Sequence, residues 1–193
     1  MIFRLKNILL LFTIALYGCS FYSFKGSIPA HIKSVYISPI QNKTMESSIT
    51  NVIKTQLEKS FIKENVLKLL PQEDAGSRID ITITSFTDLP YSYDIDDLDA
   101  TGFETVNAYE VTIKASVEWY DVKNDLVLFQ QQFVGFGRYD PNVDIGLDGI
   151  DNDNDTFIDG MDDDEFGLPR ESAINFATDD IVNLVISNIV STW

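Results

Sequence analysis

The sequence predicts an α+β domain, a two-layer sandwich in which two helices pack on one face of a four-stranded, mainly antiparallel sheet. Two segments, 77–86 and 108–122, alternate between apolar and polar residues, and a short turn leads from the second into a further strand. Amphipathic helical patterns stand before and after the strands, giving the order strand, helix, three strands, helix. Two helices can cover the single apolar face of such a sheet, and an acidic loop is inserted before the last helix.

The first two elements lie between residues 33 and 62. Lys33 to Ile40, "KSVYISPI", has the composition of a short strand, which Pro39 interrupts. Residues 45–62 follow as an amphipathic helix with Glu46 in its first turn, where a carboxylate complements the helix dipole. Its apolar residues recur at helical spacing: Ile49, Val52, Ile53, Leu57 and Phe61. The next apolar segment, Val66 to Leu70, is too short to assign.

Three strands come next. Residues 77–86 and 108–122 alternate apolar and polar side chains, so one face of each strand is expected to be buried and the other wet. The second strand has six apolar positions on one face: Tyr109, Val111, Ile113, Ala115, Val117 and Trp119. The tripeptide "KND" predicts a tight turn into an antiparallel strand at 126–137. Residues 88–104 between the first two strands read as a long acidic loop, which is usually functional or disordered.

The last element is predicted to be a helix that begins near Pro169, a residue favoured in the first helical turn. Glu171 follows in that turn, and Trp193 ends the chain. The apolar face is formed by Ala173, Ile174, Ala177, Ile181, Leu184, Val185 and Ile189.

The N-terminus has the anatomy of an export signal. Arg4 and Lys6 precede a nine-residue apolar core, Ile8 to Leu16, which is too short for a membrane span of about 20 residues. Leu16-Tyr17-Gly18-Cys19 then resembles a bacterial lipobox, although Tyr17 is bulkier than the usual residue. In such signals the cysteine sulfur receives a diacylglycerol and the chain is cut just before it. No later segment is expected to reach transmembrane length.

We therefore expect a signal peptide at 1–18, a lipidated tether at 19–31 and a folded body at 32–193, held at a membrane by acyl chains such as palmitate. Cys19 is the only cysteine, so it cannot form an internal disulfide. The alternative is an ordinary secreted protein, whose unmodified thiol would be a liability in an oxidising compartment. Ser20 after the cysteine is compatible with the outer membrane in many Gram-negative bacteria.

Charge narrows the class of partner. The chain has 30 acidic and 14 basic residues, which makes nucleic acid an unfavourable partner. Residues 19–70 carry seven lysines against three glutamates, whereas residues 71–193 carry five basic residues against 27 acidic ones. An anionic ligand or membrane surface is therefore expected to meet the N-terminal half, unless these lysines are simply solvated.

These features together resemble the LPS-assembly lipoprotein family, LptE, over most of the mature chain. The resemblance is carried by Cys19 in its lipobox and by "FYSFKGSIPAHIKSVYISPIQNKT", an aromatic tether that leads into a strand. It is also carried by the strand pair "WYDV…FVGFGRYD" and by the closing helix "AINFATDDIVNLVISNIVSTW". The acidic segment 140–165 is not expected in a typical member.

The resemblance implies a periplasm-facing lipoprotein of the cell outer membrane that partners the β-barrel translocon LptD. Members of the family are thought to act as a plug within that barrel. They help it to assemble and help lipopolysaccharide to reach the outer leaflet. Direct contact with lipopolysaccharide is a further implication, but no residue of this chain can be assigned to it.

The acidic segment 140–165 holds eleven carboxylates and no basic residue. Six of its residues occupy positions 1, 3, 5, 7, 9 and 12 of an EF-hand-like calcium loop, the residue at position 7 by its backbone carbonyl. They are Asp151, Asp153, Asp155, Phe157, Asp159 and Asp162. Thr156 replaces the usual glycine, and aspartate replaces glutamate at position 12. We predict one weakly bound structural calcium ion. The alternative is a solvated, disordered loop.

Three classes of function remain after these observations. The leading hypothesis is an assembly lipoprotein of lipopolysaccharide export, which needs no cofactor. The second is a calcium-dependent surface or adhesion lipoprotein in which the acidic segment is the working part. An enzyme is not expected, because the chain lacks a nucleophile elbow, a phosphate-binding glycine loop and a Cys/His cluster. The sole histidine, His31, is assigned to a polar part of the tether.

Overall fold

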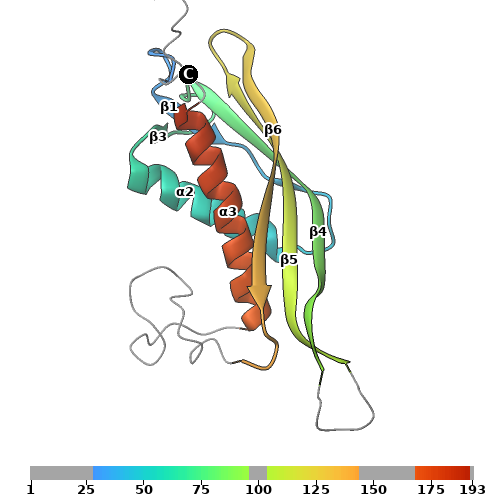
Figure 1. The fold of residues 1–193 in the computed structure, drawn as a ribbon. Coiled ribbons are helices and arrows are strands. Elements are labelled where there is room, and N and C mark those ends of the chain that lie inside the picture. The colour runs from blue at the N-terminus through green and yellow to red at the C-terminus, as the bar shows by residue number, and fades with distance from the viewer. Residues whose placement is uncertain (1–27, 96–103, 144–167, 192–193) are drawn as a thin grey trace, which may run out of the picture.

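The computed structural model describes residues 28–95, 104–143 and 168–191. Cys19 and the six predicted calcium ligands lie outside these residues. Figure 1 shows two helices beside one twisted sheet, with two strands extending well beyond the helices. In chain order the elements are β1 (Ser34–Ile37), β2 (Gln41–Asn42), α2 (Ser48–Glu64), β3 (Lys68–Leu69), β4 (Ser77–Ile95), β5 (Glu104–Asp121), β6 (Leu126–Tyr139) and α3 (Pro169–Ser191).

The sheet has six strands, not the four that the sequence predicts. Their order is β3-β1-β4-β5-β6, and β2 pairs with β4 beyond the end of β1. β1 and β2 run parallel to β4, whereas the long strands β4, β5 and β6 are antiparallel, as expected. The two additional strands, β2 and β3, have two residues each, which is too short for an alternating pattern to reveal them.

The predicted alternation correctly identifies the buried face of the sheet. In β5 all five inward residues from Val111 to Trp119 have no exposed surface, and Ile79, Ile81 and Ile83 of β4 are equally buried. Tyr109, the sixth predicted position, is half-buried and stacks on Tyr139 with ring centroids 5.4 Å apart. The core therefore lies between this face and the helices.

The predicted loop at 88–104 is mostly a β-ribbon, which corrects the expectation. β4 and β5 stay paired from Ser77↔Asp121 out to Ile95↔Glu104, and only residues 96–103 between them lie outside the described chain. Register shifts follow Ile83, Pro90 and Ser92. Each bulge interrupts the alternation of side chains, so the alternating sequence pattern ends although the strand continues.

α2 runs from Ser48 to Glu64, close to the predicted 45–62, and buries Ile49, Ile53, Leu57 and Phe61. Asn65 ends the helix in the left-handed conformation, with its N–H bonded to the carbonyl of Phe61. Glu46 precedes the helix instead of lying in its first turn. Its carboxylate accepts bonds from Ser48 and Arg170, so its function is to join elements.

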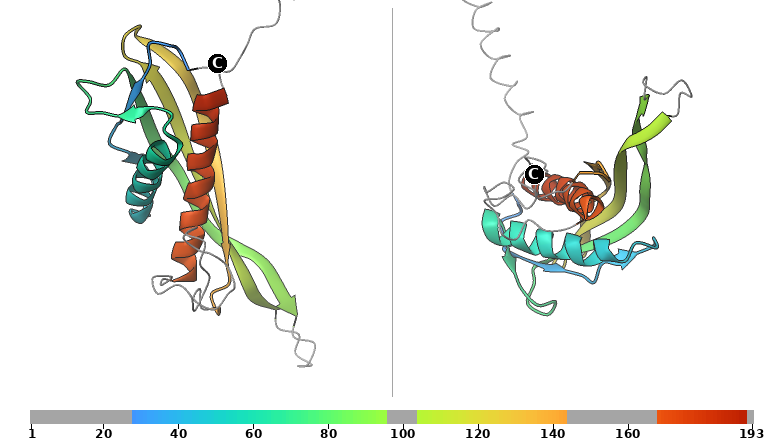
Figure 2. Two further views of the ribbon diagram at one scale, coloured as in Figure 1. Left: turned by 90° about the vertical axis from the view of Figure 1, so that its left-hand side faces the viewer. Right: turned by 90° about the horizontal axis from the view of Figure 1, so that it is seen from below.

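α3 begins at Pro169 as predicted, and it lies along the edge strand β6, while α2 packs on α3 and β3 (Figures 1 and 2). Leu184 is the one member of the predicted apolar face that is exposed. Contrary to expectation, α3 is long and apolar enough by composition to cross a membrane, but half of that span is buried inside the body. The core helix of a soluble protein can also meet this criterion of length and composition. The predicted two-layer sandwich is incomplete, because the helices leave the outer part of the β4–β5 ribbon uncovered (Figure 2).

Two glycines of β6 let α3 approach the strand backbone directly. A Cβ at Gly135 would lie 1.8 Å from the carbonyl oxygen of Ala177, and one at Gly137 would lie 1.9 Å from that of Ala173. Asp180 of α3 also accepts a bond from the edge N–H of Phe136 at 3.2 Å. The helix therefore covers the free edge of β6, which would otherwise be open to pairing with another chain.

Candidate interaction surfaces

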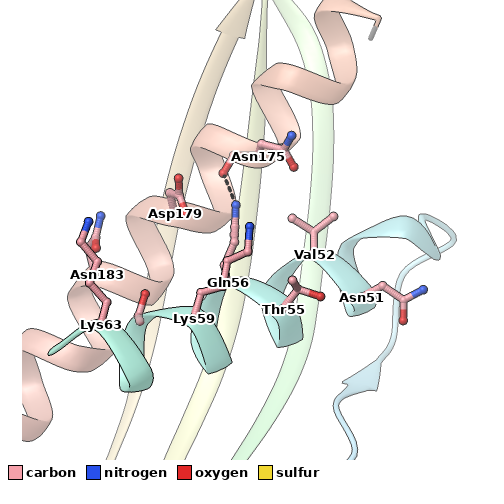
Figure 3. A pocket seen from close by; sticks show the side chains of 10 residues that line it. Asn51, Val52, Thr55, Gln56, Lys59, Lys63, Asn175, Asp179 and Asn183 are labelled. Carbon is pink, nitrogen blue, oxygen red and sulfur yellow. Dashed lines mark hydrogen bonds between the residues drawn. The ribbon is translucent and has the colours of Figure 1, made fainter. Parts of the chain in front are cut away.

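A groove of about 550 Å³ runs between α2 and α3 (Figure 3). It is lined by Asn51, Val52, Thr55, Gln56, Lys59, Ser60, Lys63, Asn175, Asp179 and Asn183. Gln56 spans the groove and donates from Nε2 to the carbonyl oxygen of Asn175 at 3.3 Å. Its Oε1 is buried and has no hydrogen-bond partner within the described chain. The groove is therefore polar and offers one buried acceptor.

Charges of both signs face this groove. Lys59 and Lys63 extend from α2, and Asp179 lies opposite on α3 (Figure 3). Burial and the neighbouring Asp180 raise the pKa of Asp179, while the two lysines act to lower it. Within the described residues no lysine nitrogen comes within the 4.0 Å of an ion pair to Asp179. Lys59 and Lys63 of α2 therefore form no direct ion pair with any carboxylate in the described part of the chain.

The start of the body is fixed to the β5–β6 turn by a buried carboxylate. His31 Nε2 lies 2.6 Å from Oδ2 of Asp121, whose side chain is 2% exposed. The other oxygen of Asp121 accepts the backbone N–H groups of Lys123 and Asn124 at 3.0 and 3.2 Å. Burial would raise the pKa of Asp121, but these bonds and the contact with His31 hold it below its usual value. His31 is therefore an anchor point of the fold, not a residue of a free polar tether.

A second cluster joins four segments where α3 begins. Arg170 donates to Asp88 of β4 at 2.7 Å and to Glu46 at 3.0 Å, and its guanidinium lies 5.2 Å from the centroid of Phe86. Tyr139 of β6 also donates to Asp88 at 3.1 Å. Burial and the charge of Asp88 raise the pKa of Tyr139 to about 12. The Ser48 hydroxyl and Arg170 outweigh burial and lower the pKa of Glu46. These bonds fix the base of the β4–β5 ribbon to both helices.

The projecting ribbon carries exposed apolar side chains. Leu89, Tyr91 and Tyr93 of β4 are each about half exposed or more, and Phe136 on the adjoining strand β6, outside the ribbon itself, is 50% exposed. Arg138 lies over the ring of Tyr91 at 3.7 Å and binds Glu110 at 2.8 Å. Aromatic side chains with an arginine are typical of protein interaction surfaces. We call Leu89, Tyr91, Tyr93 and Phe136 the ribbon patch.

Sequence reasoning did not find these surfaces. The groove residues lie on two helices that are far apart in the sequence. Gln56 of α2 and Asn175 of α3, which share a hydrogen bond, are separated by 119 positions. Arg170 did offer a signal, because it is the only basic residue after Arg138 and stands at a helix N-terminus, where a cation is unfavourable. Such an arginine needs carboxylate partners. Within residues 28–95, 104–143 and 168–191 no group of three His, Cys, Asp or Glu residues could hold a metal ion.

A comparison with protein families shows which family the chain belongs to. The model of the lipopolysaccharide-assembly family, LptE, matches residues 32–189, which include every element from β1 to nearly the end of α3. The chain belongs to the LptE family. This confirms the family resemblance that the strand pair and the closing helix carry in the sequence, whereas the lipobox lies outside the matched residues. An LptE assembly factor agrees with the expectation of no catalytic activity.

Solved structures give only distant similarities to this LptE chain. A putative lipoprotein from Caulobacter crescentus has 9% identity and a TM-score of 0.44, covering 79% of this chain and 88% of its own. A hypothetical protein from Chlamydia trachomatis has 9% identity and a TM-score of 0.47, with coverages of 82% and 98%. A minor lipoprotein from Acinetobacter baumannii has 11% identity and a TM-score of 0.44, with coverages of 82% and 93%. No curated protein matches the sequence.

Proposed function

We propose that this LptE-family chain is an outer-membrane lipoprotein, acylated at Cys19, that faces the periplasm and acts as partner and plug of the LptD barrel. In this role it helps lipopolysaccharide to reach the outer leaflet and helps the outer membrane to assemble. The observation that carries the proposal is the family match, which spans almost the entire folded body.

The arrangement of the two ends supports this role. The first described residues and the β5–β6 turn lie at one end of the sheet, and the projecting ribbon lies at the other (Figure 1). A chain tethered at Cys19 would therefore point its ribbon patch away from its own anchor. The Arg170 cluster holds the base of that ribbon, so the patch is presented on a fixed element and not on a loop.

The test is recovery of the barrel. Full-length tagged protein is purified from its own outer membranes, and mass spectrometry identifies any large β-barrel that accompanies it. Replacing Leu89 and Tyr93 by serine should lower the yield of barrel at least several-fold, whereas Ile62→Ser, at an exposed apolar residue of α2, should not. A barrel recovered equally well without residues 32–193 would exclude the proposed partnership.

The second candidate is a calcium-dependent surface or adhesion lipoprotein. The observation that favours it is the acidic segment 140–165, whose Asp151, Asp153, Asp155, Asp159 and Asp162 follow a calcium-loop register. Deleting this segment separates the two functions. An intact outer-membrane barrier together with a lost calcium-dependent contact would favour the second candidate, and an intact barrier with no other defect would favour the first.

A further inference from the structure

The β5–β6 turn exposes three aliphatic side chains at one end of the molecule. Val122, Leu126 and Val127 are 47%, 55% and 43% exposed, and they flank the turn whose Asp125 has a φ of 54°. α3 also ends at this end of the molecule, where Val190 in its last turn is 45% exposed (Figure 1). We call Val122, Leu126 and Val127 the turn tip.

The chain leaves the folded body beside this turn. Ile28 packs against the core, and His31 is bound to Asp121, the last residue of β5 before the turn. Only eight residues lie between Cys19 and Ile28, so a fully extended chain places the anchor at most about 32 Å from the body. Acyl chains at Cys19 would therefore hold the turn tip close to the bilayer at a high effective concentration.

The exposed charges near the β5–β6 turn largely cancel one another. Lys33, Lys68 and Lys123 are exposed there, and the backbone of Lys68 bonds to that of Lys33. Glu73, Asp74 and Asp125 are also exposed on the adjoining segments. The lysines are thus offset by as many carboxylates. Aliphatic area, not net charge, is what this end of the molecule offers.

We propose that the turn tip sits in the headgroup region of the bilayer that carries the Cys19 acyl chains, as a second membrane contact. The inference rests on the proposed lipidation. A lipid surface suits the turn tip, because its three aliphatic side chains lie beside the point where the chain tethered at Cys19 enters the body, and small apolar surfaces can insert at the headgroup boundary. The β4–β5 ribbon, where Arg138 lies over the ring of Tyr91, projects at the opposite end of the sheet (Figure 1).

The test uses full-length acylated protein in vesicles of phosphatidylethanolamine and phosphatidylglycerol. Leu126→Cys is labelled with an environment-sensitive fluorophore, and quenching by nitroxide lipids is measured. Tyr93→Cys on the ribbon and Ile62→Cys on α2 carry the same dye as controls. Quenching at residue 126 should exceed that at both control positions at least threefold.

Intact mass of the same sample separates this inference from the proposed function. Acylated protein whose residue 126 is quenched no more than residue 93 would overturn the membrane contact of the turn tip and leave the lipoprotein assignment standing. A mature chain without acyl groups would overturn both, because the tether that places the tip at the bilayer would not exist.

Discussion

At the scale of single residues, two clusters show how this acidic chain satisfies carboxylates that are buried or partly buried. Arg170 contacts two carboxylates from segments 42 residues apart in the sequence, and it compensates for its own unfavourable place at a helix N-terminus. Asp121 is nearly fully buried, and its two carboxylate oxygens are bound by His31 and by backbone N–H groups of the turn that follows it. Both clusters connect segments that are far apart in the chain.

The Arg170 cluster predicts a measurable loss of stability. Arg170→Gln should lower the free energy of unfolding by about 1–2 kcal/mol, because Asp88 and Glu46 lose a charged donor while remaining partly buried. Urea unfolding measures the change. Arg138→Gln is the matched control, since its pair with Glu110 is more exposed and should be worth less than about 1 kcal/mol. Equal losses in the two variants would contradict the assigned role.

Asp121 predicts a pH dependence with a definite sign. The pKa of Asp121 is lowered in the folded state from its ordinary value of 3.8. The stability that Asp121 contributes is therefore present above pH 3.8 and is lost as the pH falls through the pKa of the folded state. Asp121→Asn should cost about 2 kcal/mol near neutral pH, and the gap from the native protein should close as pH drops below 3.8. Asp80→Asn, at an exposed pair with Arg78, should show little change at any pH. A gap that widens in acid would reverse the assignment.

At the scale of elements, the close packing of α3 on β6 depends on two residues without side chains. Gly135→Ala should destabilise the fold by about 3 kcal/mol, because the added methyl would overlap the backbone of Ala177 and the helix would have to move. Gly76→Ala is the control, since its Cβ would meet no atom closer than 3.6 Å. Thermal unfolding of both variants makes the comparison. If the two variants melted at the same temperature, α3 would not be seated on β6 as described.

Elements with regular periodicity could be predicted, and irregular ones could not. α2, α3 and the buried face of β5 follow from spacing alone, because one side of each is packed against the core. β2 and β3 are too short to show a period, and the bulges after Ile83 and Pro90 hide the continuation of β4. The groove could not be predicted because its two walls, at Gln56 and Asn175, meet only through tertiary packing.

At the scale of the whole molecule, the two ends of the sheet differ in what they expose. One end has the aliphatic turn tip and the point where the chain enters the body, and the other has aromatic side chains on a ribbon. The polar groove lies between α2 and α3 (Figure 3). The proposed role as a tethered plug would require such a division, because one end would have to stay at the bilayer surface while the other meets a partner.

A calcium titration tests whether the acidic segment 140–165 binds a cation. If Asp151, Asp153 and Asp155 hold calcium, adding the ion should raise the melting temperature with half-saturation at about 10⁻⁴ to 10⁻³ M, because bound calcium relieves repulsion among eleven carboxylates. Asp153→Asn with Asp155→Asn should abolish that shift. Asp163→Asn with Asp164→Asn removes the same charge outside the predicted register, so it should keep most of the shift. A shift reduced equally by both double variants would mean general screening of charge instead of a calcium site, since screening depends on the number of carboxylates and not on their order.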